Sequence, residues 1–409
     1  MLSSITNAPQ ARRTLLFGSA MHIWSDLYFA LLIPLLIFIQ DDMELSYTEI
    51  GLLRSVFSGA SGVLQIPAGI LAEGLGEFWL LVFGNVWVAA GLVAMALSPV
   101  FFVLLISSFV GGLGGGAQHP LASSMVSRAY DDRGRSTAVG TVNFAGDLGK
   151  VAAPAVVAGA IAMSLGWRTT MWVVGAAGMV FMVLAAMTRR RVDIAPSTTR
   201  TSLKTGGARE TTQVAAFTAL SVVGFLDSAT RSSTLVFLPF IMDSKGMSAT
   251  QITLMLVLLF GGGAAGKYVC GWLGERYSAV SLIWGTKGLT AILLVTSLAA
   301  PPIAMAPLMV VLGIGLNGTS SVLYATVADF VPARRRARLY GLFYTTNEGG
   351  TVLAPILYGL VADIFSLRTT MALMGLATAA ILPTSLSLRK HLSEDAGAAI
   401  TPSQREETE

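Results

Sequence analysis

The sequence has few charged residues and a single cysteine, and each shortage excludes a class of protein. Asp, Glu, Lys and Arg together make up 12% of the 409 residues, whereas soluble domains carry about 25%. The one cysteine, Cys270, allows no disulfide within the chain and no thiolate metal cluster. The sequence also contains no Walker-type phosphate loop, no ligand set with metal-site spacing and no Gly-x-Ser-x-Gly elbow. We therefore expect no enzymatic chemistry, no ATP drive, and no cofactor or metal.

Long apolar runs fill the chain instead, and 54% of its residues are hydrophobic. A helix needs about 20 mostly apolar residues to cross a bilayer, and lipid offers no hydrogen bonds to an open backbone. The runs are continuous and do not alternate, which favours helices over strands. We predict an all-α membrane protein with 12 transmembrane helices, at about residues 14–40, 46–73, 78–97, 100–127, 135–164, 168–188, 213–243, 249–274, 278–299, 302–330, 337–365 and 368–388.

The predicted spans form two groups of six, separated by a basic polar stretch. The predicted domains are an N-terminal half (1–188), a cytoplasmic basic linker (189–212), a C-terminal half (213–388) and a cytoplasmic polar tail (389–409). The linker is short and lies next to the membrane, so contact with anionic lipid explains its charge better than nucleic acid does.

The basic residues of the loops indicate the orientation of the chain. Loops rich in Lys and Arg stay in the cytoplasm. With the N-terminus inside, most of the 27 basic residues fall on the cytoplasmic side, and only Arg168, Lys245 and Arg368 fall in the opposite loops. The sequence thus predicts a multi-pass protein of the cell inner membrane, with both termini in the cytoplasm.

Short motifs recur in the same order in both halves, about 200 residues apart. GWRTTM at 166–171 matches SLRTTM at 366–371, and DLGKVAAP at 147–154 matches EGGTVLAP at 348–355. Parallel six-helix repeats of this kind are typical of transporters that hold their substrate near the middle of the membrane, between the halves.

Two loop segments resemble a motif of the major facilitator superfamily. GILAE at 69–73 and GWLGER at 271–276 each follow the second span of a half. The resemblance implies the major facilitator fold, and it implies a gating or interface role for Glu73, Glu275 and Arg276. Both copies have glutamate where the family has aspartate, and the first copy lacks the basic residues.

Two further motifs resemble the fosmidomycin-resistance type of facilitator, an antimetabolite-export subgroup. The first span contains His22, the run DLY at 26–28 and Pro34. The fourth span has a glycine-rich run that ends in His119 and Pro120. This resemblance implies efflux of a drug-like compound, and antibiotic resistance as its consequence.

Charged residues inside the predicted spans mark candidate proton sites. Each costs at least about 2.5–3.5 kcal/mol to insert, so each needs a partner or a wet cavity. His22 and Asp26 lie four residues apart and share a helix face, and Asp227 and Arg231 repeat this spacing in the seventh span. We expect the two pairs to face each other across the transport path. Asp26, His22 and Asp227 are the predicted proton-coupling residues, with a proton and Arg231 competing for Asp26; static ion pairs that fix helix packing are the alternative.

The predicted substrate contacts are basic, acidic and aromatic side chains of the cavity helices. Arg231 and Arg54 are expected to hold an anionic group, and Glu348 to lie near Arg54. Plain packing, a helix kink or a structural ion pair is the alternative for each residue. The predicted set is Arg231, Arg54, Tyr28, His119, Tyr344 and Glu348.

The fifth and eighth spans carry charges that we interpret as an interface lock. Asp147 and Lys150 lie three residues apart in the fifth span, where the resembled subgroup has an uncharged run. Lys267 of the eighth span is expected to reach Asp147 across the half–half interface. Lys287 of the ninth span is interpreted as a lipid-contacting lysine that extends toward the membrane surface.

Together these features predict a proton-coupled secondary active transporter that exports a small anionic or zwitterionic compound by alternating access. The first alternative is proton-coupled uptake of a small organic anion, because the sequence does not fix the direction of transport. The second is a membrane sensor that binds a ligand and does not transport it. The expected partners are the substrate, protons and membrane lipids, without nucleic acid, and the protein is expected to act as a monomer.

Overall fold

The computed structural model describes residues 9–130, 132–190, 192, 213–274, 276–331 and 336–388, and these contain helices but no strand. Residues 193–212 of the predicted linker and the whole predicted tail lie outside the described residues. The elements of the N-terminal half are α1 (Pro9–Met43), α2 (Tyr47–Val63), α3 (Gln65–Leu75), α4 (Glu77–Ala96), α5 (Phe101–Leu113), η2 (Gly114–Ala117), α6 (Gln118–Ala129), α7 (Asp132–Ala162) and α8 (Trp167–Ala186). Those of the C-terminal half are α9 (Val214–Asp243), α10 (Ala249–Leu273), α11 (Ala279–Ala299), η3 (Pro302–Ala304), α12 (Met305–Phe330), α13 (Arg336–Ile364) and α14 (Leu367–Ala379).

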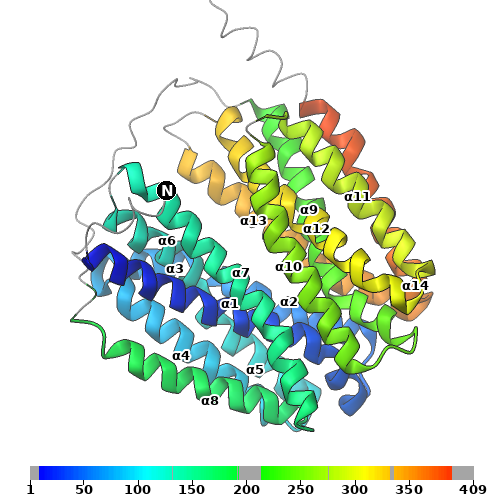
Figure 1. Ribbon diagram of the computed structural model, residues 1–409, viewed down its shortest axis with the longest axis horizontal. Helices are drawn as coiled ribbons and strands as arrows, with labels where there is room; N and C mark the ends of the chain where they lie inside the picture. Colours follow the sequence, from blue (N-terminus) through cyan, green and yellow to red (C-terminus); the bar gives the residue numbers. More distant parts are fainter. Residues whose placement is uncertain are drawn as a thin grey trace, which may run out of the picture.

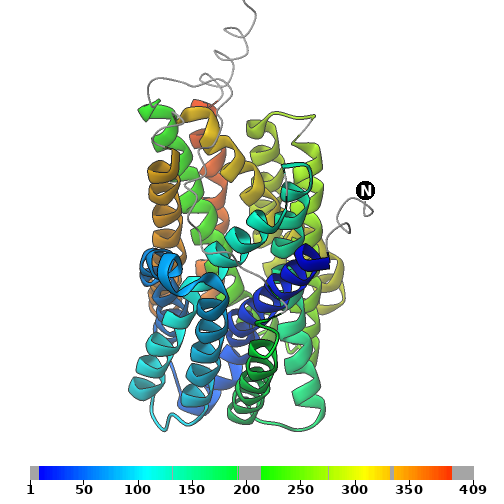
Figure 2. The same cartoon turned by 90° about the vertical axis from the view of Figure 1, so that its left-hand side faces the viewer.

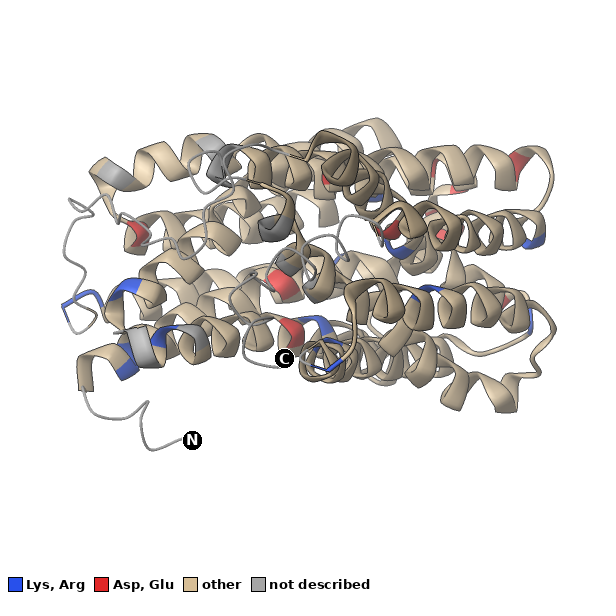
Figure 3. Cartoon of the chain, turned by 90° about the horizontal axis from the view of Figure 1, so that it is seen from above, with Lys and Arg blue, Asp and Glu red and all other residues tan. Residues whose placement is uncertain are grey.

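Ten helices of the described part are long and apolar enough to cross a membrane, which makes the chain a multi-pass membrane protein. The remaining predicted spans are those at 46–73 and 337–365, where α2, α3 and α13 lie. The count of 12 spans and the orientation stay predictions. Figure 3 shows how few charged residues the helices carry along their length.

Two predicted spans are interrupted helices. The second span breaks into α2 and α3 at Leu64, and the fourth narrows into the 3-10 turn η2 before α6 begins. Pro120 lies in the first turn of α6, and its ring nitrogen has no hydrogen to bond back to the preceding turn. The glycine-rich run thus ends in a local change of helix geometry next to Pro120.

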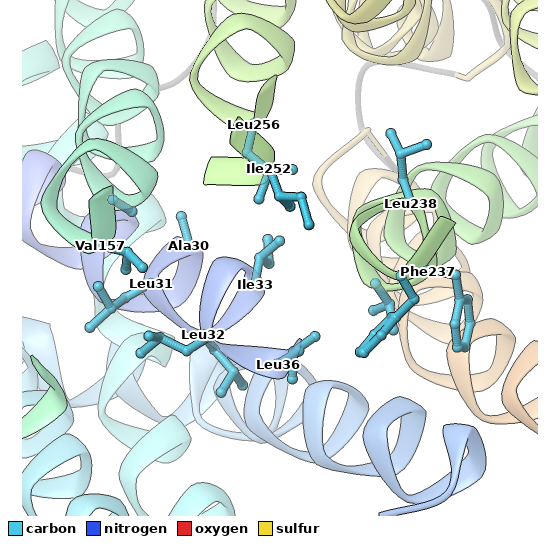
Figure 4. Close-up of a cluster of buried hydrophobic side chains, with 14 of the residues drawn as sticks. Ala30, Leu31, Leu32, Ile33, Leu36, Val157, Phe237, Leu238, Ile252 and Leu256 are labelled. Atoms are coloured by element: carbon cyan, nitrogen blue, oxygen red, sulfur yellow. The ribbon is translucent and has the colours of Figure 1, made fainter. Parts of the chain in front are cut away.

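The helices form two groups that lie side by side (Figure 1), and most of them run roughly along one direction (Figure 2). One hydrophobic cluster, which we call the shared core, contains residues of both groups, such as Leu31 and Ile33 of α1 and Leu256 of α10 (Figure 4). Two other clusters each belong to one group alone, with Met21 in the first and Phe217 in the second. The halves therefore share a core toward one end, the closed end, and pack separately toward the other.

The contact between α2 and α13 joins the halves at the closed end. Gly51 of α2 lies directly against the backbone carbonyl of Pro355, which leaves no room for a Cβ atom. Asp363 near the end of α13 accepts hydrogen bonds from the backbone nitrogens of Tyr47 (2.8 Å) and Thr48 (2.9 Å), and from the Thr48 hydroxyl (2.5 Å). A carboxylate is favoured at a helix N-terminus, where backbone N–H groups lack partners. We call this arrangement of Tyr47, Thr48 and Asp363 the latch.

Candidate functional site

A cavity of about 220 Å³ lies between the halves. Its walls come from α1, α2, α3, η2, α6 and α7 of one half and from α9, α10, α12 and α13 of the other. Six charged or titratable side chains line it: Asp26, Arg54, His119, Lys150, Arg231 and Glu348. Five of these six are predicted proton-coupling or substrate-binding residues, and the sixth, Lys150, is a predicted interface residue.

Asp26, His119 and Lys150 line this cavity, and the buried His22 contacts both Asp26 and His119. We call these four residues the Asp26 cluster. The Nε2 of His22 lies 3.7 Å from the Asp26 carboxylate, which confirms that the two residues share a face of α1. The Nε2 of His119 lies 3.6 Å from the other carboxylate oxygen, and the Lys150 Nζ lies 3.1 Å from Oδ2. Asp26 is buried, so the Lys150 ammonium supplies the balancing charge, and the two imidazoles take the place of water beside the carboxylate.

The cation beside Asp26 is Lys150, and the predicted pairing with Arg231 is wrong in this structure. Arg231 lines the same cavity, but it donates a hydrogen bond to the Ser228 hydroxyl at 3.3 Å. Close packing of α7 on α1 explains the difference, because Gly149 lies directly against the Ile23 carbonyl. That approach brings Lys150 within reach of Asp26 before any side chain of the other half.

The hydrogen bond between the two histidines sets their tautomers. His22 Nε2 and His119 Nδ1 are 2.8 Å apart, so one proton lies between them. If the His22 Nε2 carries that proton, the His119 Nε2 carries its own and points a donor at the Asp26 carboxylate; the opposite choice would face a lone pair toward a negative charge. His22 is almost fully buried, whereas 55% of the His119 side chain is exposed. His119 is therefore the member of the pair that reaches the cavity.

Two histidines and a carboxylate within 4.8 Å of one another also resemble the ligands of a metal ion. The Lys150 ammonium, however, lies 3.1 Å from the Asp26 carboxylate, where it repels a second cation. The shared proton occupies a nitrogen of each histidine as well. The Asp26 cluster thus suits protons better than a metal.

The predicted contact between the fifth and eighth spans is confirmed. Lys267 of α10 donates to both carboxylate oxygens of Asp147, at 2.7 and 2.9 Å, and Lys150 lies 3.2 Å from Oδ1 of the same residue. Asp147 of one half is thereby bound to a lysine of the other. Its role as a lock stays a prediction.

Arg54, Arg231 and Glu348 lie on the cavity wall away from the Asp26 cluster. Arg54 donates to the Phe29 carbonyl at 3.3 Å, and its Nε is buried without a partner. Glu348 has no ion pair among the described residues. The positive charges of Arg231 and Arg54 are nevertheless close enough to attract its carboxylate. The predicted neighbourhood of Arg54 and Glu348 is confirmed, and their donors and acceptors retain capacity for a ligand.

Asp227 does not belong to the cavity, which corrects its predicted place on the transport path. It forms an ion pair with Lys287 of α11, and both side chains are almost completely buried. Lys287 also donates to the Gly315 carbonyl of α12 at 3.1 Å. The interpretation of Lys287 as a lipid-facing lysine is therefore wrong, because a buried carboxylate and a backbone carbonyl hold it inside the half.

Both predicted tyrosine contacts lie outside the cavity lining. Tyr28 is fully buried and packs against Trp24 and the α8 backbone at Gly178. Tyr344 is exposed and stacks on Tyr324, with ring centroids 4.7 Å apart. Every face of a long apolar helix carries aromatic residues. Their spacing in the sequence therefore could not distinguish Tyr28 and Tyr344 from the residues that line the cavity.

The loop-motif residues give less information. Glu275 and the side chain of Glu73 lie outside the described residues, and the Arg276 guanidinium lies over the Trp272 ring, 4.3 Å from its centre.

Sequence reasoning missed the ion pair between Glu77 at the start of α4 and Arg128 at the end of α6. Glu77 stands in the first loop motif, where a basic residue was expected, and this departure was the available signal.

The comparisons with known proteins agree with this architecture. The family model described as Major Facilitator Superfamily matches residues 15–218 and 220–403. The chain belongs to the major facilitator superfamily. Its relatives are transporters and its fold is theirs, so it is not an enzyme and it moves small molecules.

Two relatives cover most of the chain. The fosmidomycin resistance protein of Escherichia coli (strain K12) is 24% identical over 378 residues, which are 88% of this chain and 90% of the relative. The hexuronate transporter of Bacillus subtilis (strain 168) is 23% identical over 351 residues, 80% of this chain and 82% of the relative. The resemblance to the fosmidomycin-resistance type, predicted from the first and fourth spans, is thus confirmed as a similarity that extends over most of the chain.

Two solved structures share the fold. A bacterial homologue of the human lysosomal transporter Spinster has a TM-score of 0.72 at 15% identity, covering 95% of this chain and 96% of the other. A mutant of the nucleoside transporter NupG has a TM-score of 0.76 at 14% identity, covering 92% and 99%.

Proposed function

We propose that this facilitator is a proton-coupled secondary transporter of the inner membrane that exports a small anionic or zwitterionic compound by alternating access. The observation that carries the proposal is the cavity between the halves, with a buried carboxylate on one wall and two arginines on the other. Asp26 takes up and releases the coupling proton, with His119 and His22 beside it. Arg231 and Arg54 hold the anionic group of the cargo.

The charge of the cargo decides whether cargo and proton bind together or displace each other. A purely anionic cargo that binds an arginine or lysine removes that cation from a nearby carboxylate, which then favours a proton. Such a cargo and the proton bind together. A cargo that also carries a cationic or donor group can place it on Glu348 or Asp26 and displace a proton. Export in exchange for protons therefore favours a cargo with both kinds of group.

Proton-coupled uptake of an organic anion is the second candidate. Glu348 supports it, because this carboxylate lies on the same wall as two arginines that an anion would occupy. The similarity to a hexuronate transporter also supports an organic anion as the cargo. In this case anion and proton would move inward together.

Proton movement in everted membrane vesicles with an acid interior separates these functions. Phosphonates, organic acids and common antibiotics are added in turn to vesicles with wild-type protein, Asp26→Asn or Arg231→Gln. We expect one compound to release luminal protons through wild type, with the release abolished in Asp26→Asn and needing about tenfold or more cargo in Arg231→Gln, since a charge-assisted hydrogen bond contributes about 1.5–3 kcal/mol.

Asp41→Asn is the matched control, because Asp41 is an exposed acid at the end of α1, far from the cavity lining. It should behave as wild type. If Asp26→Asn transports as well as wild type, Asp26 is not the coupling site; if cargo draws protons in the direction of its own movement, the protein is a symporter.

A further inference from the structure

Four charged side chains of alternating sign form a continuous chain from the cavity to the other half of the molecule. Asp26 of α1 lies 3.1 Å from Lys150 of α7, and Lys150 lies 3.2 Å from Asp147 on the next turn. Asp147 lies 2.7 Å from Lys267 of α10. We call these residues the charge chain. It joins the proposed proton site to one of the two main contacts between the halves, the packing of α7 on α10.

The two inner members of the chain are each shared by two partners. Lys150 has one positive charge and lies between the carboxylates of Asp26 and Asp147. Asp147 in turn lies between two lysines, and both approach the same oxygen, Oδ1. A stronger bond from Lys150 to Oδ1 therefore comes at the expense of the Lys267 bond to that oxygen, and Lys267 keeps its second bond, to Oδ2 at 2.9 Å.

Loss of charge at Asp26 changes this balance in a definite direction. A neutral Asp26 no longer holds the Lys150 ammonium, and among the described residues Asp147 is then the one carboxylate that contacts Lys150. The other groups that face Asp26 are His22 of α1 and His119 of α6, and neither contacts Asp147 in the described part of the chain. Lys150 then competes with Lys267 for Asp147.

We propose that uptake of a proton by Asp26 releases Lys150 onto Asp147 and thereby weakens the Asp147–Lys267 bond between the halves. Lys150 and Asp147 act as positioning residues, which convert the charge state of the cavity into the strength of the α7–α10 contact. This inference rests on the proposed function in one respect, that Asp26 is the residue that takes up the proton.

The other contact between the halves provides an internal comparison. At the latch, Asp363 is bound by two backbone nitrogens and a hydroxyl, with no lysine or arginine among the bonds described. Neutralising Asp26 should therefore loosen α7 from α10 and leave the chemistry of the latch unchanged.

Distance measurements between spin labels on α7 and α10 test the proposal without any cargo. Leu148 and Tyr268 are exposed and lie one residue from Asp147 and Lys267, so cysteines there report on the contact. They are introduced into purified full-length protein with Cys270→Ser. In Asp26→Asn, the neutral mimic, we expect the distance distribution to shift to longer values than in wild type.

Lys150→Met gives the opposite expectation and separates the proposal from general damage. Without Lys150, Asp147 has Lys267 alone, so the distance should stay at its shortest value, and Asp26→Asn added to Lys150→Met should produce no further shift. A merely structural role predicts loosening in both single variants. Asp363→Asn is the control, since it breaks the latch and should leave the shift caused by Asp26→Asn intact.

An unchanged distance in Asp26→Asn, or loosening in Lys150→Met, would overturn the inference. Both outcomes are independent of the transport assay. Proton-driven transport without the distance shift would retain the proposed function and reject the charge chain. The distance shift without proton movement would retain the charge chain and reject proton coupling.

Discussion

Asp26 and Asp227 are buried acids on α1 and α9, the first helices of the two repeats, yet their surroundings differ. Asp26 meets Lys150 and two histidines beside the cavity, whereas Asp227 meets Lys287 deep inside its own half. Repetition in the sequence correctly placed both acids on the first helix of a half. It could not show which one reaches the cavity, because that depends on the partner helix that packs against each.

The Asp227–Lys287 pair predicts a clear stability effect. Removing one member of a buried ion pair costs about 3–5 kcal/mol, because the other charge is left without a partner, whereas replacing both can be nearly neutral. Lys287→Met should therefore lower the thermal unfolding midpoint in detergent strongly. The double variant Asp227→Asn with Lys287→Met should recover most of the loss. Equal destabilisation in the single and double variants would show that the pair itself is not what stabilises the half.

Residues whose evidence is local were located correctly from the sequence. The i, i+4 spacing of His22 and Asp26 fixes their shared face whatever the rest of the fold does. To predict Lys150 as the partner of Asp26, one must know how α1 packs on α7. To predict that Lys287 points inward, one must know where α12 lies. The distant contact that was predicted, between Asp147 and Lys267, came from the arrangement of helices that the family resemblance implies. The residues themselves carry no signal for such contacts in a single chain.

At the scale of the helices, the close approach of α2 and α13 depends on glycine. A Cβ atom on Gly51 would collide with the Pro355 carbonyl, which is backbone and cannot rotate away. Gly62 of the same helix has no atom within 4 Å of such a Cβ position. The two glycines thus form a matched pair of test sites.

We expect Gly51→Ala to force α2 and α13 apart, weaken the latch and reduce transport, while Gly62→Ala leaves transport near the wild-type level. Both substitutions raise intrinsic helix propensity by about 1 kcal/mol, so propensity does not distinguish them. Transport of the cargo and expression level are measured together in membranes. Similar transport by both variants would mean that the tight contact at Gly51 is not needed for the cycle.

Element positions were more predictable than element interruptions. Apolar length placed the helices within a few residues, since a bilayer imposes a minimum run. The break at Leu64 and the 3-10 turn at 114–117 were not expected as boundaries, because neither interrupts hydrophobicity. Pro120 was the available sign of the second one.

For the molecule as a whole, the two repeats build one shared core and one shared cavity. The shared core holds the halves together toward the closed end, where the latch lies, and each half has its own core toward the other end. The cavity is thus bounded by the two halves, and the alternating access that we propose would tilt them about these contacts. The sequence predicted this arrangement through its repeats and its family resemblance, and it left the identity of the cargo open.

Alternating access requires that the cavity open to each side of the membrane in turn, and thiol labelling measures this opening. Ser61 lines the cavity and becomes the only thiol in the variant Ser61→Cys with Cys270→Ser. A membrane-impermeant reagent is applied to right-side-out and to everted vesicles. Ser248→Cys at the N-cap of α10 and Ser278→Cys at the N-cap of α11, which follows the other end of α10, serve as one-sided controls. We predict that Ser61→Cys reacts from both sides of the membrane and that cargo protects it. Reaction from one side only, under every condition, would contradict alternating access.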